Sequence, residues 1–181
     1  MSRVEKIAAC RPSAIVLREK DLSPENYLRL AAQVVEICAA HGVECILHNF
    51  YGAAIELGVR RIHLPLSALR KISAADKKFF DVIGASCHSI DEVREAQNFG
   101  CTYVTAGHVF ATNCKKNLAP RGLKFLAEIV DAASVPVLAI GGITAENISQ
   151  VKSVGAAGAC IMSGFMACAD VAGFCKNLRR F

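Results

Sequence analysis

Short apolar runs alternate with amphipathic stretches along the whole chain. Each run spans three or four residues and is bounded by Gly, Pro or polar residues, as buried parallel strands usually are. The runs lie at residues 14–17, 45–47, 61–64, 82–85, 102–105, 137–140 and 158–161. The pattern therefore predicts seven parallel strands.

The stretches between these runs have helical patterns. Residues 90–99 follow Ser89, a candidate N-cap, and Glu92 completes a capping box. Residues 145–154 follow Thr144, a second N-cap candidate. Helices are also predicted over 2–10, 26–40 and 123–133; in 26–40 the apolar positions are Leu28, Leu30, Val34, Val35 and Cys38.

Seven β–α repeats without a linker predict one α/β domain over residues 1–181. The alternative is an open doubly wound sheet, but no Gly-x-Gly-x-x-Gly motif follows any strand. The predicted fold is a TIM-type (β/α)8 barrel. Because a helix over 2–10 precedes the first run, the first barrel strand is expected to be absent from this chain, leaving an open strand edge.

Composition narrows the class of protein. Hydrophobic residues make up 53% of the 181 residues, which indicates a globular chain. No apolar run reaches the roughly 18 residues of a membrane span, and the N-terminus lacks an apolar signal core. The net charge of +5 is spread out and there is no Trp, which argues against nucleic-acid binding. A cytoplasmic protein without membrane or nucleic-acid partners is expected.

Nine cysteines occur without any Cys-x-x-Cys pair. Most lie in apolar helix or strand patterns, so buried free thiols in a reducing compartment are expected rather than disulfides or metal ligands.

In a barrel, the loops that follow the strands form the functional face. The loop 107–122 carries His108, Lys115, Lys116 and Arg121. Imidazole can move protons near neutral pH, and the neighbouring cations can hold an anion. This combination predicts proton chemistry on a small phosphorylated or carboxylated substrate. Other polar residues at strand ends are Arg18, Lys20, Asn49 and Ser86.

Two glycine-containing loops follow the last two strands. Gly141-Gly142 and Met162-Ser163-Gly164 let backbone N–H groups approach a phosphate. The alternative is that these glycines only form tight turns. A metal site is not expected, because Glu19 is the only acid at the strand ends.

The remaining histidines have different settings. His63 is expected in the core and His41 at a helix end, whereas His48 and His88 lie at strand ends with open roles.

Several segments together resemble the thiamine phosphate synthase superfamily over essentially the whole chain. They are Leu-Arg-Glu-Lys-Asp-Leu-Ser (17–23), Ile-His-Leu-Pro (62–65), Gly-Ala-Ser-Cys-His-Ser (84–89), the 107–122 loop, Pro-Val-Leu-Ala-Ile-Gly-Gly-Ile (136–143) and Gly-Ala-Cys-Ile-Met-Ser-Gly (158–164). The resemblance implies a (β/α)8 barrel. Synthases of this superfamily join a pyrimidine pyrophosphate to a thiazole phosphate and hold Mg²⁺ with two aspartates. Here Phe50 and Ala68 stand at those positions.

The 107–116 segment, Gly-His-Val-Phe-Ala-Thr-Asn-Cys-Lys-Lys, is most similar to the thiazole tautomerase (TenI) branch. That resemblance implies an isomerase of thiamine biosynthesis, which converts a carboxythiazole ethyl phosphate to its aromatic tautomer without metal or cofactor. His108 would be the catalytic acid/base. The backbone of Gly141, Gly142, Met162 and Ser163 would bind phosphate, Arg18, Lys20 and Lys115 would contact carboxylate or phosphate, and Asn49 and Ser86 would orient the ring.

Two alternatives stay open. One is a thiamine phosphate synthase with other metal contacts, and the other is a non-catalytic protein that binds thiazole phosphate. Whether the chain forms a homo-oligomer also stays open.

Overall fold

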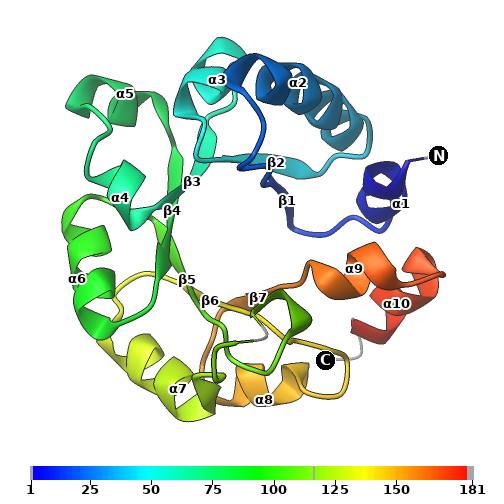
Figure 1. Cartoon of the computed structure of the whole chain (residues 1–181), viewed down its shortest axis with the longest axis vertical. Helices are drawn as coiled ribbons and strands as arrows, with labels where there is room; N and C mark the ends of the chain where they lie inside the picture. Colours follow the sequence, from blue (N-terminus) through cyan, green and yellow to red (C-terminus); the bar gives the residue numbers. More distant parts are fainter. Residues whose placement is uncertain (1, 116, 179–181) are drawn as a thin grey trace. The chain divides into compact units, whose positions relative to one another are not determined.

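The computed structural model describes residues 2–115 and 117–178. The chain packs as two compact units, Met1–Ile83 and Gly84–Phe181 (Figure 1). Lys116 of the predicted anion loop lies outside the described residues. Among the described residues, no helix is long and apolar enough to cross a membrane. The expectation that residues 1–181 form one domain stays a prediction.

The first unit alternates strands with helices. Its strands β1 (Ala14–Leu17), β2 (Glu44–His48) and β3 (Arg61–Pro65) pair in parallel and in chain order. In Figure 1, α2 and α3 lie on one face of these strands. The helices are α1 (Arg3–Ala9), α2 (Pro24–Ala40), α3 (Tyr51–Glu56), α4 (Leu66–Leu69) and α5 (Ala74–Phe79).

The sequence explains how these helices begin and which side they bury. Ser2 caps α1 in a reciprocal capping box with Glu5, and Ser23 caps α2 just before Pro24. The buried side chains of α2 recur every three or four residues, so a single face meets the strands. They are Tyr27, Ala31, Val34 and Cys38.

The second unit continues the same alternation. Strands β4 (Val82–Cys87, which begins at the end of the first unit), β5 (Tyr103–Gly107), β6 (Val137–Ile140) and β7 (Gly158–Cys160) are parallel and follow in chain order. α7 packs against β5 and β6, and α8 packs against β7. The helices of the second unit are α6 (Ile90–Asn98), the short 3₁₀ helix η1 (Asn113–Lys115), α7 (Gly122–Ala132), α8 (Ile148–Ser153), α9 (Ser163–Ala167) and α10 (Val171–Leu178).

All seven predicted strands are present, but several extend beyond their apolar runs. β4 reaches Cys87, so Ser86 lies within the strand. The prediction that Ser86 lies in the loop after this strand was wrong. The ladder continues there because Ser86 pairs with Thr105 of β5.

Two helix starts also differ from expectation. The helix predicted over 145–154 begins only at Ile148, because the Asn147 side chain accepts from the Thr144 N–H and holds a turn there. Ser89 caps α6 as expected, but the Glu92 carboxylate accepts from the His88 N–H instead of completing the box at Ser89.

Candidate functional site

His108 is the first residue after β5, and only 5% of it is exposed. Its Nε2 lies 3.2 Å from the carbonyl oxygen of Leu118. Because a carbonyl only accepts, Nε2 is assigned as the donor, and a neutral ring then keeps its lone pair on Nδ1. His108 therefore ties the far side of its own loop to the end of β5.

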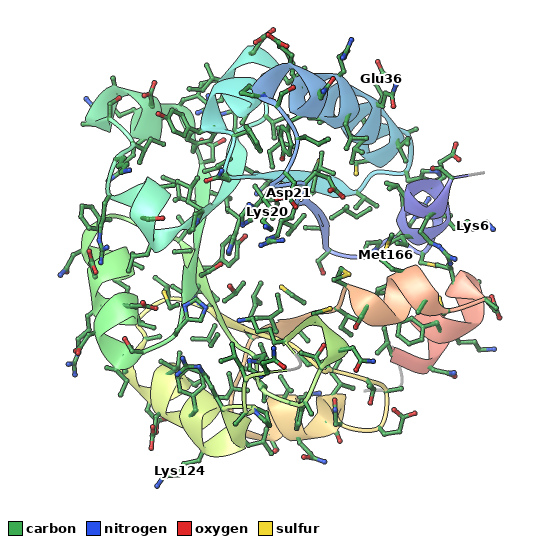
Figure 2. All side chains as sticks on the ribbon, in the orientation of Figure 1. Lys6, Lys20, Asp21, Glu36, Lys124 and Met166 are labelled. Carbon is green, nitrogen blue, oxygen red and sulfur yellow. The ribbon has the colours of Figure 1, made fainter. Side chains whose placement is uncertain are left out.

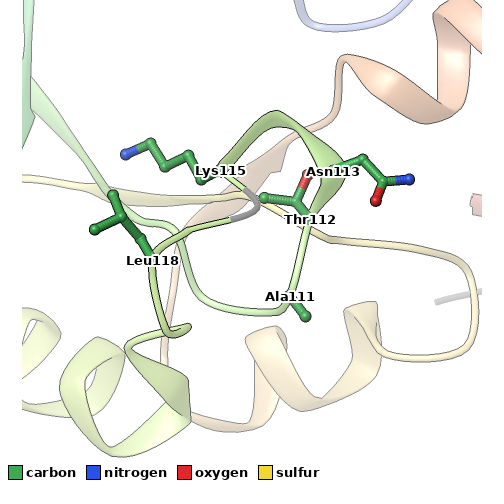
Figure 3. Close-up of a pocket in the computed structure, with 5 residues that line it drawn as sticks. All are labelled: Ala111, Thr112, Asn113, Lys115 and Leu118. Carbon is green, nitrogen blue, oxygen red and sulfur yellow. The ribbon is translucent and has the colours of Figure 1, made fainter.

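The loop beyond His108 lines an open surface pocket of about 350 Å³ in the second unit (Figure 3). The Lys115 and Leu118 side chains point to one side of the loop, whereas Asn113 points to the other. Lys115 is exposed. The predicted cation of this loop is therefore available to an anionic ligand. The lining residues are Ala111, Thr112, Asn113, Lys115 and Leu118.

The glycine pair after β6 packs against this loop, backbone to backbone. The Val109 N–H donates to the Ile140 carbonyl and the Phe110 N–H to the Gly141 carbonyl, both at 3.0 Å. A Cβ on Gly141 would lie 2.3 Å from the His108 Cβ. These glycines thus let the two loops approach each other closely. They also adopt the positive φ angles, +99° and +65°, that the turn requires.

The loop after β7 starts at the same end of the sheet. Ile140 pairs with Cys160, so the chain leaves β6 and β7 at equivalent positions. Met162 and Ser163 are exposed there, and Ser163 begins the short α9. The structure thus brings the two loops predicted for phosphate to neighbouring strand ends, and their binding of phosphate stays a prediction.

In the first unit, the predicted residues lie just after β1 and β2. Arg18 and Lys20 are exposed, and the Lys20 Nζ lies 3.0 Å from the Asp21 carboxylate (Figure 2). Asn49 has φ +70°, and its N–H donates to the His63 carbonyl at 3.0 Å. Asparagine tolerates this left-handed backbone better than most residues, which fits its place at the sharp turn into α3.

The sequence did not reveal a tyrosine that joins these two strand ends. The Tyr27 hydroxyl donates to the Leu17 carbonyl at 2.8 Å and accepts from the His48 N–H at 3.0 Å. Its ring stacks on Phe50, with centroids 4.2 Å apart. Burial raises the pKa of Tyr27 to about 12, so the hydroxyl stays protonated. Tyr27 thus fixes the ends of β1 and β2 from which Arg18 and Asn49 follow.

Replacing Tyr27 by phenylalanine is expected to lower the free energy of unfolding by about 1–3 kcal/mol, because a buried N–H and a partly buried carbonyl lose their partner while the ring packing is kept. Urea-induced unfolding measures the change. Tyr51→Phe is the matched control, since the Tyr51 side chain is only partly buried. Equal stability of the two variants would contradict the role assigned to the Tyr27 hydroxyl.

Two histidines stack in the same unit. His48 and His63 are paired residues of β2 and β3, with ring centroids 5.6 Å apart. Burial, aided by the charge of Arg18, lowers the pKa of His48 to about 4. Burial and the neighbouring His48 lower the pKa of His63 to about 3. Both rings are therefore neutral at neutral pH, and the expectation that His63 is a core residue is confirmed.

The side chains do not fit the Mg²⁺ that the resemblance to synthases implies. Phe50 stacks on Tyr27, and Ala68 offers only a methyl group. Within residues 2–115 and 117–178, no three His, Cys, Asp or Glu side chains lie close enough to hold a metal ion. Hard cations need oxygen ligands, and these two positions supply none.

Comparison with solved structures identifies the fold of the chain. It matches the solved thiamine phosphate pyrophosphorylase of Pyrococcus furiosus with a TM-score of 0.83 and 24% identity, over 98% of this chain and 86% of that one. A 3-hexulose-6-phosphate synthase matches with a TM-score of 0.75 and 17% identity, over 98% of this chain and 92% of that one. The chain therefore has the predicted α/β fold of TIM type.

Sequence comparison gives the family. The family described as thiamine monophosphate synthase matches residues 1–165. The thiamine-phosphate synthase of Ruminiclostridium cellulolyticum is 31% identical over 180 residues, which cover 97% of this chain and 84% of the relative. Thiamine-phosphate synthase 2 of Streptococcus pneumoniae is 31% identical over 94% of this chain and 82% of its own length. The chain belongs to the thiamine monophosphate synthase family.

These relatives show that the predicted thiazole tautomerase, an isomerase, is wrong. They are named thiamine-phosphate synthases and match nearly the whole chain, whereas the tautomerase prediction rested on the 107–116 segment and on Phe50 and Ala68 at the aspartate positions. The His108 Nε2 binds the Leu118 carbonyl within the loop, and a catalytic role for His108 stays a prediction. What the comparisons support is a transferase of thiamine biosynthesis.

Proposed function

We propose that this chain is a thiamine-phosphate synthase, a transferase that moves a pyrimidine group from its pyrophosphate to a thiazole phosphate. The observation that carries the proposal is the close packing of Gly141 and Gly142 on the 107–122 loop. This loop also carries His108 and the exposed Lys115. The likeness to named synthases over most of the chain supports it.

Each predicted residue has a part in this reaction. The thiazole phosphate would accept from the N–H groups of Gly141, Gly142, Met162 and Ser163, with Lys115 adding positive charge. In the first unit, Arg18 and Lys20 would neutralise the leaving pyrophosphate and Asn49 would orient a ring; in the second unit, Ser86 would orient a ring. His108 would be a positioning residue, since it holds the loop through Leu118. The cytoplasm remains the proposed location.

The proposal predicts synthase activity that does not depend on a divalent metal. The chain, incubated with both substrates in EDTA, is expected to form thiamine phosphate as fast as with Mg²⁺, because Phe50 and Ala68 cannot coordinate the ion. Mass spectrometry of the product measures the rate. Activity that EDTA removes and Mg²⁺ restores would contradict the metal prediction while keeping the synthase.

The missing carboxylates also favour a second candidate, a protein that binds thiazole phosphate without turnover. Calorimetry with thiazole phosphate alone separates the two. Binding of thiazole phosphate with no thiamine phosphate formed, with or without Mg²⁺, would overturn the synthase and support the binding protein.

A further inference from the structure

The first unit holds a second pocket, of about 420 Å³, between the start of α2 and the start of α3. Its volume falls within the range typical of small-molecule sites, about 300–1,000 Å³. Apolar and aromatic residues form most of its wall. The lining residues are Pro24, Glu25, Leu28, Asn49, Phe50, Tyr51, Gly52, Ala53 and Glu56.

One aromatic wall of this pocket is held in place. The Phe50 ring stacks on Tyr27 at 4.2 Å with the two planes 23° apart. Tyr27 is fully buried and is itself fixed by its two backbone hydrogen bonds. A ligand that contacts Phe50 therefore meets a ring whose position is already set, which reduces the entropy lost on binding.

The charge of the lining is negative. Glu25 lies in the first turn of α2 and Glu56 is the last residue of α3, and both are exposed. None of the nine lining residues is basic. Carboxylates beside aromatic rings favour a cation with a flat apolar body, because a ring face attracts positive charge and repels anions.

We propose that this pocket binds a planar cationic nitrogen heterocycle. The inference deepens the proposed synthase function and rests on it, because thiamine phosphate carries a thiazolium ring and an aminopyrimidine that can take a proton. Asn49, a predicted substrate residue, lines the pocket and makes it continuous with the strand end after β2.

The test measures binding of small fixed cations by calorimetry. The probes are 3-methylthiazolium and 1-methyl-4-aminopyrimidinium, which separate the two sources of the cation, and neutral thiazole is the uncharged comparison. At least one cation is expected to bind more tightly than thiazole. Replacing both acids (Glu25→Gln with Glu56→Gln) is expected to weaken cation binding on the order of fivefold.

A matched control lies on the same helix. Glu36 is exposed on α2 and does not line the pocket (Figure 2), so Glu36→Gln is expected to leave cation binding unchanged. Phe50→Leu removes the aromatic face, and circular dichroism checks that each variant folds. NMR amide shifts that move at Tyr51 and Gly52 on adding the cation would support the assignment.

Three results would overturn the proposal: no binding of either cation, equal binding of thiazole and the cations, or cation binding unaffected by both the double Gln variant and Phe50→Leu. The synthase assay is run on the same preparations. Synthase activity without cation binding would remove the pocket alone, whereas cation binding without thiamine phosphate formation would remove the synthase alone.

Discussion

Replacing Gly142 by alanine is expected to abolish synthase activity and to lower the free energy of unfolding by about 2–4 kcal/mol. A Cβ at this position would lie 2.4 Å from the Ala111 carbonyl oxygen and 2.7 Å from the Phe110 carbonyl oxygen. Both neighbours are backbone atoms and cannot rotate away. The φ of +65° adds strain for any residue with a Cβ.

The loss of activity follows from the same contact. Separating Gly141 and Gly142 from residues 110–111 displaces the N–H groups that are proposed to bind phosphate. It also moves the 107–122 loop, which His108 holds in place. Because phosphate binding positions the substrate, a shift on the order of 1 Å is enough to remove most of the rate. Urea unfolding and product formation are the two measurements.

Gly100→Ala is the control for backbone strain alone. Gly100 has φ +86° and open space around its Cα, so its alanine variant is expected to lose only about 1 kcal/mol and to keep full activity. A Gly142→Ala variant as stable and active as Gly100→Ala would show that the loops move apart without consequence and would contradict the proposed phosphate site.

The strands could be predicted because parallel strands covered on both faces are short apolar runs. Their ends were less predictable. β2 ends at His48, β3 at Pro65 and β4 at Cys87, each beyond the predicted end. Sheet hydrogen bonds belong to the backbone, so pairing continues past the last apolar side chain and a polar residue such as Ser86 is drawn into the strand.

The site was only partly predictable, because its contacts join distant parts of the chain. The packing of Gly141 and Gly142 on residues 108–111 depends on β5 and β6 being neighbours, and no local spacing reveals it. Tyr27 reaches Leu17 and His48, which lie 10 and 21 residues away, and in the sequence it is one more residue of an amphipathic helix. The tautomerase prediction failed because the 107–116 segment and the two replaced aspartates were weighed above the similarity of the whole chain to synthases.

The stacked histidines predict a steep loss of stability in acid. The pKa of His48 is about 4 and that of His63 about 3, both below the usual 6.5 of a free imidazole. The unfolded chain therefore binds protons that the folded chain excludes. Their stabilisation is fully present above about pH 6.5 and is lost as the pH falls from there toward about 4 for His48 and about 3 for His63.

Within that window, each pH unit is expected to remove about 1.4 kcal/mol per histidine, or roughly 3 kcal/mol for the pair between pH 6 and pH 5. His63→Leu removes one of the two groups, so it should lower this pH dependence by about 1.4 kcal/mol per unit while the contribution of His48 stays. Urea unfolding at half-unit pH steps gives the slope for each protein.

Leu64→Met is the matched control for His63→Leu. Leu64 is fully buried beside His63 in β3, and the exchange conserves volume, so it is expected to cost less than about 1.5 kcal/mol and to keep the wild-type slope. Carboxylates contribute equally to all three proteins and cancel in the comparison. An unchanged slope in His63→Leu would mean that His63 takes up its proton as readily in the folded chain as in the unfolded one, and the buried neutral pair would have to be abandoned.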